Sequence, residues 1–131
     1  ITAINKNKST IPTFIGGKSM GSRVAVHVAD LCDVAGVICL GYPFHPQNKP
    51  EKLRLEALQK LKKNSLVLQG ERDKLGSTED IQGYEIPSNC RIEYLPDGDH
   101  DLKPRKLSGF THEAHIKTAA LKASQFIQEG K

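Results

Sequence analysis

The sequence predicts an α/β protein, a three-layer α/β/α domain built around a mostly parallel sheet of about four strands. Short apolar runs alternate four times along the chain with longer segments of helical periodicity. This alternation is typical of parallel strands joined by helices that cover both faces of the sheet. A chain of 131 residues is also long enough for one domain with a buried core.

Two strand and helix pairs are predicted in the first half. Residues 11–16 form the first strand, and residues 20–31 form a helix. In that helix Ala25 and Ala29 allow close approach to the sheet, and one face carries Val24, Val28 and Leu31. The apolar, β-branched run 34–40 is the second strand. A helix follows over residues 51–61, with Pro50 at its start.

The second half repeats the alternation. Residues 65–69 form the third strand, and residues 78–83 a short helical turn. Residues 90–95 alternate apolar with charged positions, which indicates a fourth strand near the sheet edge. A final helix over residues 112–128 buries a stripe made of Ile116, Ala119, Ala120, Ala123 and Ile127.

Composition narrows the function classes. Nineteen Lys and Arg against 15 Asp and Glu give a net charge of +4, but the lysines are scattered rather than interleaved with aromatic residues, so nucleic-acid binding has little support. No run approaches the roughly 18 apolar residues of a membrane span. Cys32, Cys39 and Cys90 lack metal-ligand spacing. They are expected to be buried free thiols in a reducing cytoplasm.

The pattern Gly17-x-Ser19-x-Gly21 comes where the first strand turns into the first helix. It is typical of a nucleophile elbow, a sharp strand-to-helix turn that exposes a serine hydroxyl. Such a serine is strained toward positive φ, so the glycines two residues away are expected to be needed for clearance. The Met20 N–H, at the helix start, is the expected donor to an oxyanion. Chance occurrence and an ordinary glycine-rich turn compete with this interpretation.

A phosphate-binding loop is a second rival, because Gly17-Lys18-Ser19 matches the end of a Walker A sequence. That motif requires a glycine five residues before its Gly-Lys pair, and the chain has Pro12 there. Proline also lacks the backbone N–H that would bind phosphate. The nucleotide interpretation is rejected.

An acid and a base follow Ser19 in the chain order that elbow hydrolases use. Asp73 comes after the third strand and His100 after the fourth, so all three side chains are expected at the carboxyl ends of parallel strands. Other carboxylates compete for the role of the acid, namely Glu71, Asp97, Asp99 and Asp101. His27, His45, His112 and His115 compete with His100, although helix positions favour surface or packing roles for three of them and His45 follows the second strand.

Four segments, GGKSMGSRVA (16–25), GYPFHP (41–46), LQGERD (68–73) and PDGDHDLKPRK (96–106), together resemble the α/β-hydrolase superfamily. The resemblance is to its small dienelactone-hydrolase-like branch. It implies a Ser-His-Asp triad of Ser19, His100 and Asp73, with no cofactor or metal, acting on a small-molecule ester or related acyl bond. The pair Lys74-Leu75 departs from the Pro-Phe expected after the acid.

Residues 1–131 are therefore expected to form a single hydrolase-like domain without the amino-terminal strands of a complete member. The first strand, residues 11–16, would then be an exposed sheet edge, and a homodimer or a complementing fragment is expected to pair with it. The alternative function is a non-catalytic scaffold that serves as a protein-interaction module.

Four side chains near the expected site are candidates for substrate binding. Lys18, Lys103 and Arg105, together with Lys106, favour an anionic group on the substrate, and His45 is expected at the mouth of the pocket. A solvated basic loop is the competing interpretation of these charges.

Overall fold

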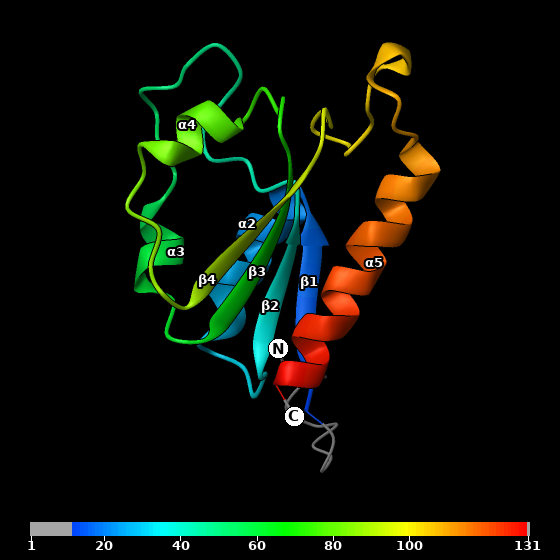
Figure 1. The fold of residues 1–131 in the computed structure, drawn as a ribbon. Coiled ribbons are helices and arrows are strands. Elements are labelled where there is room, and N and C mark those ends of the chain that lie inside the picture. Colours follow the sequence, from blue (N-terminus) through cyan, green and yellow to red (C-terminus); the bar gives the residue numbers. More distant parts are fainter. Residues whose placement is uncertain (1–11, 131) are drawn as a thin grey trace.

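A computed structural model describes residues 12–130, and within them four parallel strands form one sheet in the order β1-β2-β3-β4. The strands are β1 (Phe14–Lys18), β2 (Gly36–Leu40), β3 (Asn64–Gly70) and β4 (Cys90–Leu95). Phe14 pairs with Gly36, Gly36 with Asn64, and Ser65 with Cys90. The strands therefore start level and end at a common edge (Figure 1). The predicted parallel sheet of about four strands is confirmed.

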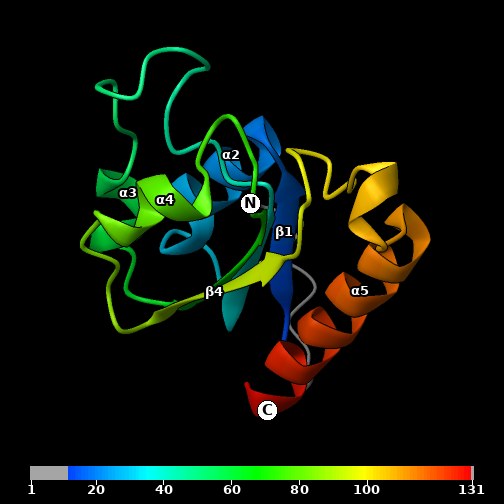
Figure 2. The same ribbon diagram turned by 45° about the horizontal axis from the view of Figure 1, so that its top comes forward.

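Helices cover both faces of the sheet, which makes the three layers that the sequence predicts (Figures 1 and 2). The helices α2 (Met20–Ala29), α3 (Glu56–Lys60) and α4 (Thr78–Gln82) contribute Val26, Leu58 and Ile81 to one core cluster. The long helix α5 (His112–Glu129) follows a 3₁₀ turn, η1 (Lys106–Ser108), and covers the other face.

The central strand β3 explains why both faces must be covered. Its side chains alternate, with Val67 in the cluster beneath α2 and α3, and Leu66 and Leu68 in the cluster beneath α5. All three are at most 1% exposed. A strand that buries apolar side chains on both of its faces is stable only between two layers of helices, as in other parallel sheets.

The predicted helix over residues 51–61 is wrong for its first half, since α3 begins at Glu56. The backbone before it is held by the loop that follows β2. The Arg54 N–H donates to the Phe44 carbonyl at 2.6 Å, and the Tyr42 hydroxyl donates to the Arg54 carbonyl at 3.1 Å. These bonds to an aromatic loop replace the hydrogen bonds that a helix opened by Pro50 would have made.

Other boundaries differ less. β1 extends through both glycines to Lys18 rather than ending at Gly16, and Ile11 lies outside the described residues. The helix after it ends at Ala29, because the Leu31 and Cys32 N–H groups donate to the carbonyls three residues back, those of Val28 and Ala29. β3 is longer by a residue at each end than predicted, and β4 has the predicted bounds.

Two predicted helix faces need correction. In α2 the alanines do face the sheet, but Val24 is 55% exposed and Leu31, beyond the helix, 68%. In α5 Ala119 is buried as expected, whereas Ile116 is 49% exposed. The face that contacts the sheet is instead rotated toward His115, Ala119 and Phe126. An aromatic contact fixes this rotation, because Phe126 packs edge-on against Phe14 of β1 with ring centroids 5.7 Å apart.

Within residues 12–130, β1 pairs with β2 on one side and is the last strand of the sheet on its other side. None of the helices in this part of the chain has the length and apolarity that crossing a bilayer requires.

The rotation of α5 can be tested by comparing Phe126→Ala with Ile116→Ala. Removing the Phe126 ring leaves a cavity against Phe14, so the free energy of unfolding should fall by about 3–5 kcal/mol. Removing the exposed Ile116 side chain should change it by about 0.5 kcal/mol or less. Urea denaturation followed by circular dichroism measures both values, and equal losses would contradict the orientation of the helix.

Candidate active site

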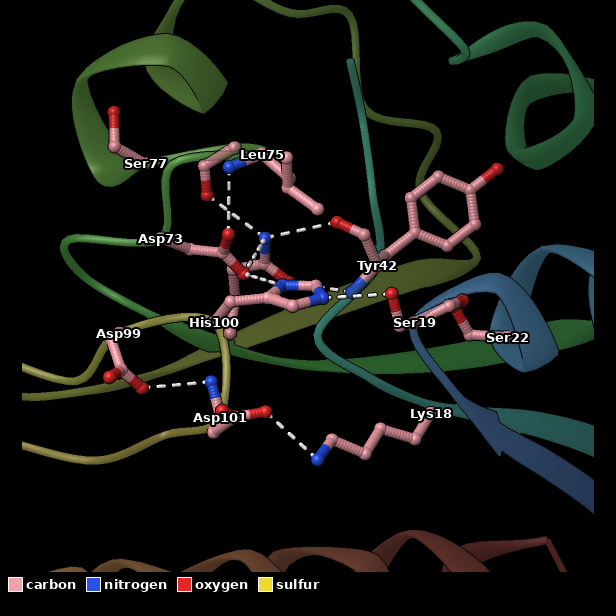
Figure 3. Close-up of polar contacts among 12 residues, drawn as sticks. Lys18, Ser19, Ser22, Tyr42, Asp73, Leu75, Ser77, Asp99, His100 and Asp101 are labelled. Carbon is pink, nitrogen blue, oxygen red and sulfur yellow. Dashed lines mark hydrogen bonds and ion pairs between the residues drawn. The ribbon is translucent and has the colours of Figure 1, made fainter. Parts of the chain in front are cut away.

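The three side chains singled out from the sequence meet at the carboxyl edge of the sheet (Figure 3). Ser19 follows β1 directly, Asp73 lies three residues after β3, and His100 lies in the turn after β4. Parallel strands end at the same edge, so residues far apart in sequence become neighbours there.

Ser19 lies at a strained turn between β1 and α2. Its φ is 53° and its ψ −120°, a combination that non-glycine residues rarely adopt. The turn is held to the sheet because the Ser19 N–H donates to the Leu40 carbonyl at 2.9 Å. Met20 is the first residue of α2, so its N–H belongs to the group at a helix start that lacks an intrahelical acceptor.

The two glycines of the elbow differ in what they allow. A Cβ at Gly17 would lie 2.3 Å from the backbone carbon of Gly21, so the sharp turn excludes any side chain at position 17. A Cβ at Gly21 would meet nothing within 4 Å in the described part of the chain. The expectation that both glycines clear the turn therefore holds for Gly17 alone, because position 21 points away from the strand.

A chain of two short hydrogen bonds links the three side chains. His100 Nε2 lies 2.8 Å from Ser19 Oγ, and His100 Nδ1 lies 2.8 Å from Asp73 Oδ2. A carboxylate accepts only, so Nδ1 donates to Asp73 and Nε2 is left to accept from the serine hydroxyl. Gly41, at φ 67°, lets the loop after β2 pass close to His100, because a Cβ there would lie 2.8 Å from the His100 carbonyl oxygen and 3.3 Å from two of its ring atoms.

Asp73 is completely buried, and three donors satisfy its carboxylate. The Leu75 N–H donates to Oδ1 at 2.8 Å, while the Gln69 amide and His100 Nδ1 bond to Oδ2 at 3.2 and 2.8 Å. Gln69 is itself fully buried and also bonds to the backbone of Tyr42 and Gly76. The sequence analysis missed its role, although a glutamine ending an otherwise apolar strand was a visible signal.

The surroundings of His100 raise its pKa. The hydrogen bond to Asp73 raises the pKa of His100 above its ordinary value, against an opposing effect of burial. Asp101 reinforces the rise in the His100 pKa and Lys18 opposes it. These two residues also pair with each other at 2.9 Å, with side chains 61% exposed, so their pairing contributes little to stability.

The competing carboxylates shape the His100 turn instead. Asp99 Oδ1 accepts the Asp101 and Lys103 N–H groups at 2.8 and 3.0 Å. Asp97 pairs with Arg105 and Arg72, and the hydrogen bond from Arg105 lowers its pKa to about 2. These bonds fix the turn around His100 from both sides.

The four predicted substrate-binding residues have different surroundings in the structure. Lys18 lies in the wall of a cavity beside His100 and pairs with Asp101, whereas Arg105 pairs with Asp97 in the turn that follows β4. Lys103 is exposed, and its backbone joins the His100 turn. His45 is only 3% exposed, and both of its ring nitrogens are hydrogen-bonded, so it does not reach the mouth of a pocket.

The remaining histidines and cysteines lie outside this hydrogen-bond chain. His27 is exposed on α2, whereas His112 and His115 bond to the carbonyls of Asp101 and Pro96 and tie α5 to the His100 turn. The three cysteines are buried as free thiols, and burial raises the pKa of Cys39 and Cys90. No group of three His, Cys, Asp or Glu side chains within residues 12–130 is arranged to hold a metal ion.

His100 contributes to the walls of two cavities. One, of about 260 Å³, includes the side chains of Arg72, Lys74 and Gln47 in its wall. The other, of about 100 Å³, is mainly apolar and is lined by Leu40, Leu102 and Ile116 together with Lys18 and Asp101. A substrate held beside His100 would thus have charged and apolar side chains within reach.

Comparison with known proteins shows which family the chain matches and which solved structures share its fold. The family model described as an alpha/beta hydrolase domain matches residues 1–128. Among solved structures, the esterase domain of a Rhodothermus marinus protein superposes with a TM-score of 0.60 at 15% identity, over 89% of this chain. An esterase from Pyrococcus furiosus gives 0.60 at 17% identity over 91% of this chain. An alpha-beta serine hydrolase homologue from Coxiella burnetii gives 0.56 at 19% identity over 82% of it.

The chain covers 60%, 56% and 46% of the length of these three proteins, respectively. At these identities the likeness establishes a shared fold.

The unequal elbow glycines predict unequal effects of Gly17→Ala and Gly21→Ala. The first forces a methyl group into the backbone of α2, and we expect the free energy of unfolding to fall by about 1–3 kcal/mol or more. The second places alanine in a helix with open space beside it, and we expect a gain of about 0.5–1 kcal/mol. Urea denaturation measures both, and equal destabilisation would mean that position 21 is also confined.

Proposed function

The chain belongs to the alpha/beta hydrolase domain family, and from this membership and the geometry of its site we propose that it is a serine hydrolase of ester or related acyl bonds. The observation that carries the proposal is the unbroken hydrogen-bond chain from Ser19 through His100 to the buried Asp73. Nucleophile, base and orienting group are the three parts that serine catalysis requires.

In the proposed mechanism, His100 Nε2 takes the hydroxyl proton as Ser19 Oγ attacks the carbonyl carbon of the substrate. The imidazolium that forms is stabilised by the Asp73 carboxylate 2.8 Å from Nδ1. His100 then gives the proton to the leaving group, and an acyl-serine is left. Water repeats the sequence with His100 as base, which releases the acid and restores Ser19.

The developing oxyanion would be stabilised by the Met20 N–H, which points from the start of α2. A small-molecule ester as the substrate is supported by the two neighbours that are described as esterases. Binding roles for Lys18, Lys103 and Arg105 stay predictions, as does a second copy or complementing segment along the side of β1 that faces away from β2.

The proposal predicts covalent labelling of Ser19 by a fluorophosphonate probe. Intact-mass and peptide mass spectrometry should find the adduct on Ser19 in the native protein, and Ser19→Ala should abolish it. Ser124→Ala removes an exposed hydroxyl on α5 and should label normally. A folded protein that takes up no label would contradict an activated serine and favour the alternative, a non-catalytic interaction scaffold.

A second prediction concerns Asp73→Asn and pH. His100 must be neutral to accept a proton, so kcat should rise with pH through the raised pKa of His100. The amide cannot hold the imidazolium, so kcat should fall by about 10⁴-fold and the rise should move to lower pH.

Hydrolysis of p-nitrophenyl acetate from about pH 5 to 9 measures both effects. Glu51→Gln, which removes an exposed negative charge, serves as the control and should match the native profile. A profile for Asp73→Asn that superimposes on the native one would exclude Asp73 as the partner of His100.

A further inference from the structure

A second histidine–carboxylate pair lies behind the site, between the loop after β2 and α4. His45 Nε2 is 2.9 Å from Asp80 Oδ2, and His45 Nδ1 is 2.9 Å from the Pro46 carbonyl oxygen. The His45 side chain is 4% exposed, whereas that of Asp80 is 35% exposed, so the ring depends on its two protein partners while the carboxylate also meets solvent. The serine mechanism described above does not use this pair.

The chemistry of the two partners fixes the protonation of His45. A carbonyl oxygen and a carboxylate are both acceptors, whereas a neutral imidazole carries one N–H and can satisfy only one of them. The two contacts are satisfied together only when both ring nitrogens carry protons. The two contacts together favour the imidazolium form of His45.

His45 holds the segment that carries Asp73 at two points. Its backbone N–H donates to the Leu75 carbonyl at 3.1 Å, and the Leu75 N–H in turn donates to Asp73 Oδ1 at 2.8 Å. Its ring holds Asp80, whose carboxylate also accepts the Ser77 N–H in the capping box that begins α4. The segment between Asp73 and Asp80 is thus fixed near both ends by one residue.

We propose that the His45 imidazolium, anchored by Asp80 and Pro46, is a positioning group that holds Asp73 against His100. This inference rests on the proposed serine-hydrolase function, because it assigns His45 a role in the same site. Deprotonation removes one of the two ring bonds and loosens the Asp73 segment, so the site works only while His45 is charged.

The electrostatic surroundings agree with this state. Burial opposes a charge on His45, yet the hydrogen bonds to Pro46 and Asp80 hold its pKa above the ordinary value. The charged groups that act on it are Asp80 from α4 and Asp73 from the loop after β3, and both favour the cation. The same hydrogen bond lowers the pKa of Asp80.

The consequence for catalysis is a bell-shaped dependence of kcat on pH. Activity requires neutral His100, which favours high pH, and charged His45, which favours low pH. The acid limb then follows the loss of the His100 proton and the alkaline limb the loss of the His45 proton, and the pKa of each is raised above its ordinary value. Stability follows the same sign, because a group with a raised pKa stabilises the fold below its unfolded pKa and loses that contribution as pH rises through the folded value.

The test compares His45→Gln and Asp80→Asn with the native protein. Gln can donate to Asp80 without titrating, so we expect the alkaline limb of kcat to disappear, with kcat at the optimum reduced about ten- to a hundred-fold and KM little changed. Asp80→Asn should lower the pH at which the alkaline limb falls. His27→Gln removes an exposed histidine of α2 and should leave the profile as it is.

Histidine NMR on the native protein supplies a readout that needs neither a variant nor a substrate. The ring nitrogens of His45 should titrate at a pH above the ordinary histidine value, and the His100 Nδ1 proton should shift as His45 loses its charge. Superimposable native and His45→Gln profiles, or a His45 that is neutral at neutral pH, would overturn the proposal. A protein that hydrolyses no ester and takes up no probe yet shows this coupled titration would refute the hydrolase function while retaining the link between His45 and Asp73.

Discussion

The arrangement of the site depends on the burial of one carboxylate, Asp73. A charged group without access to water requires hydrogen-bond donors from the protein, and the cost of leaving it unsatisfied is high. Its donors come from three places in the chain: the next turn, the end of β3 and the loop after β4. Satisfying Asp73 therefore brings these segments together and places His100 at the same time.

The parallel sheet brings the three site residues to the same edge, and hydrogen bonds in the loops then fix their positions. Strands that start level end level, so the residues after β1, β3 and β4 arrive within side-chain reach of one another. Hydrogen bonds in the turns then orient the side chains. Asp99 and Asp97 bind the N–H groups and arginines around His100, and the strained elbow aims Ser19 at its ring.

What the sequence could predict follows from which interactions are local. The strands, the elbow and the order of Ser19, Asp73 and His100 are encoded in short apolar runs and their flanking residues, and the predicted proximity of these three side chains is present. Contacts between distant segments were not readable. The sequence predicts Gln69 as the end of a strand, His45 as a pocket residue and residues 51–55 as part of a helix. The actual surroundings of each are determined by partners from other loops, which local patterns do not reveal. The face of α5 was misjudged for the same reason, since Phe126 is directed by Phe14 across the sheet.

Two histidines lie near Asp73 and differ in when they are charged. His45 is positively charged in the resting site, whereas His100 becomes positively charged only during acyl transfer. With His100 neutral, Asp73 and Asp80 carry two negative charges against the single positive charge of His45. These four side chains therefore carry a net charge of −1 in the resting site. The proton that His100 takes from Ser19 brings this sum to zero. Without the His45 charge, Asp80 and Asp73 would lose the cation that both of them favour, and the loop that carries Asp73 would lose one of the ring bonds that fix it. His45 thus acts on the loop and carboxylate behind His100, whereas the charges that act on His100 itself are Asp73, Asp101 and Lys18.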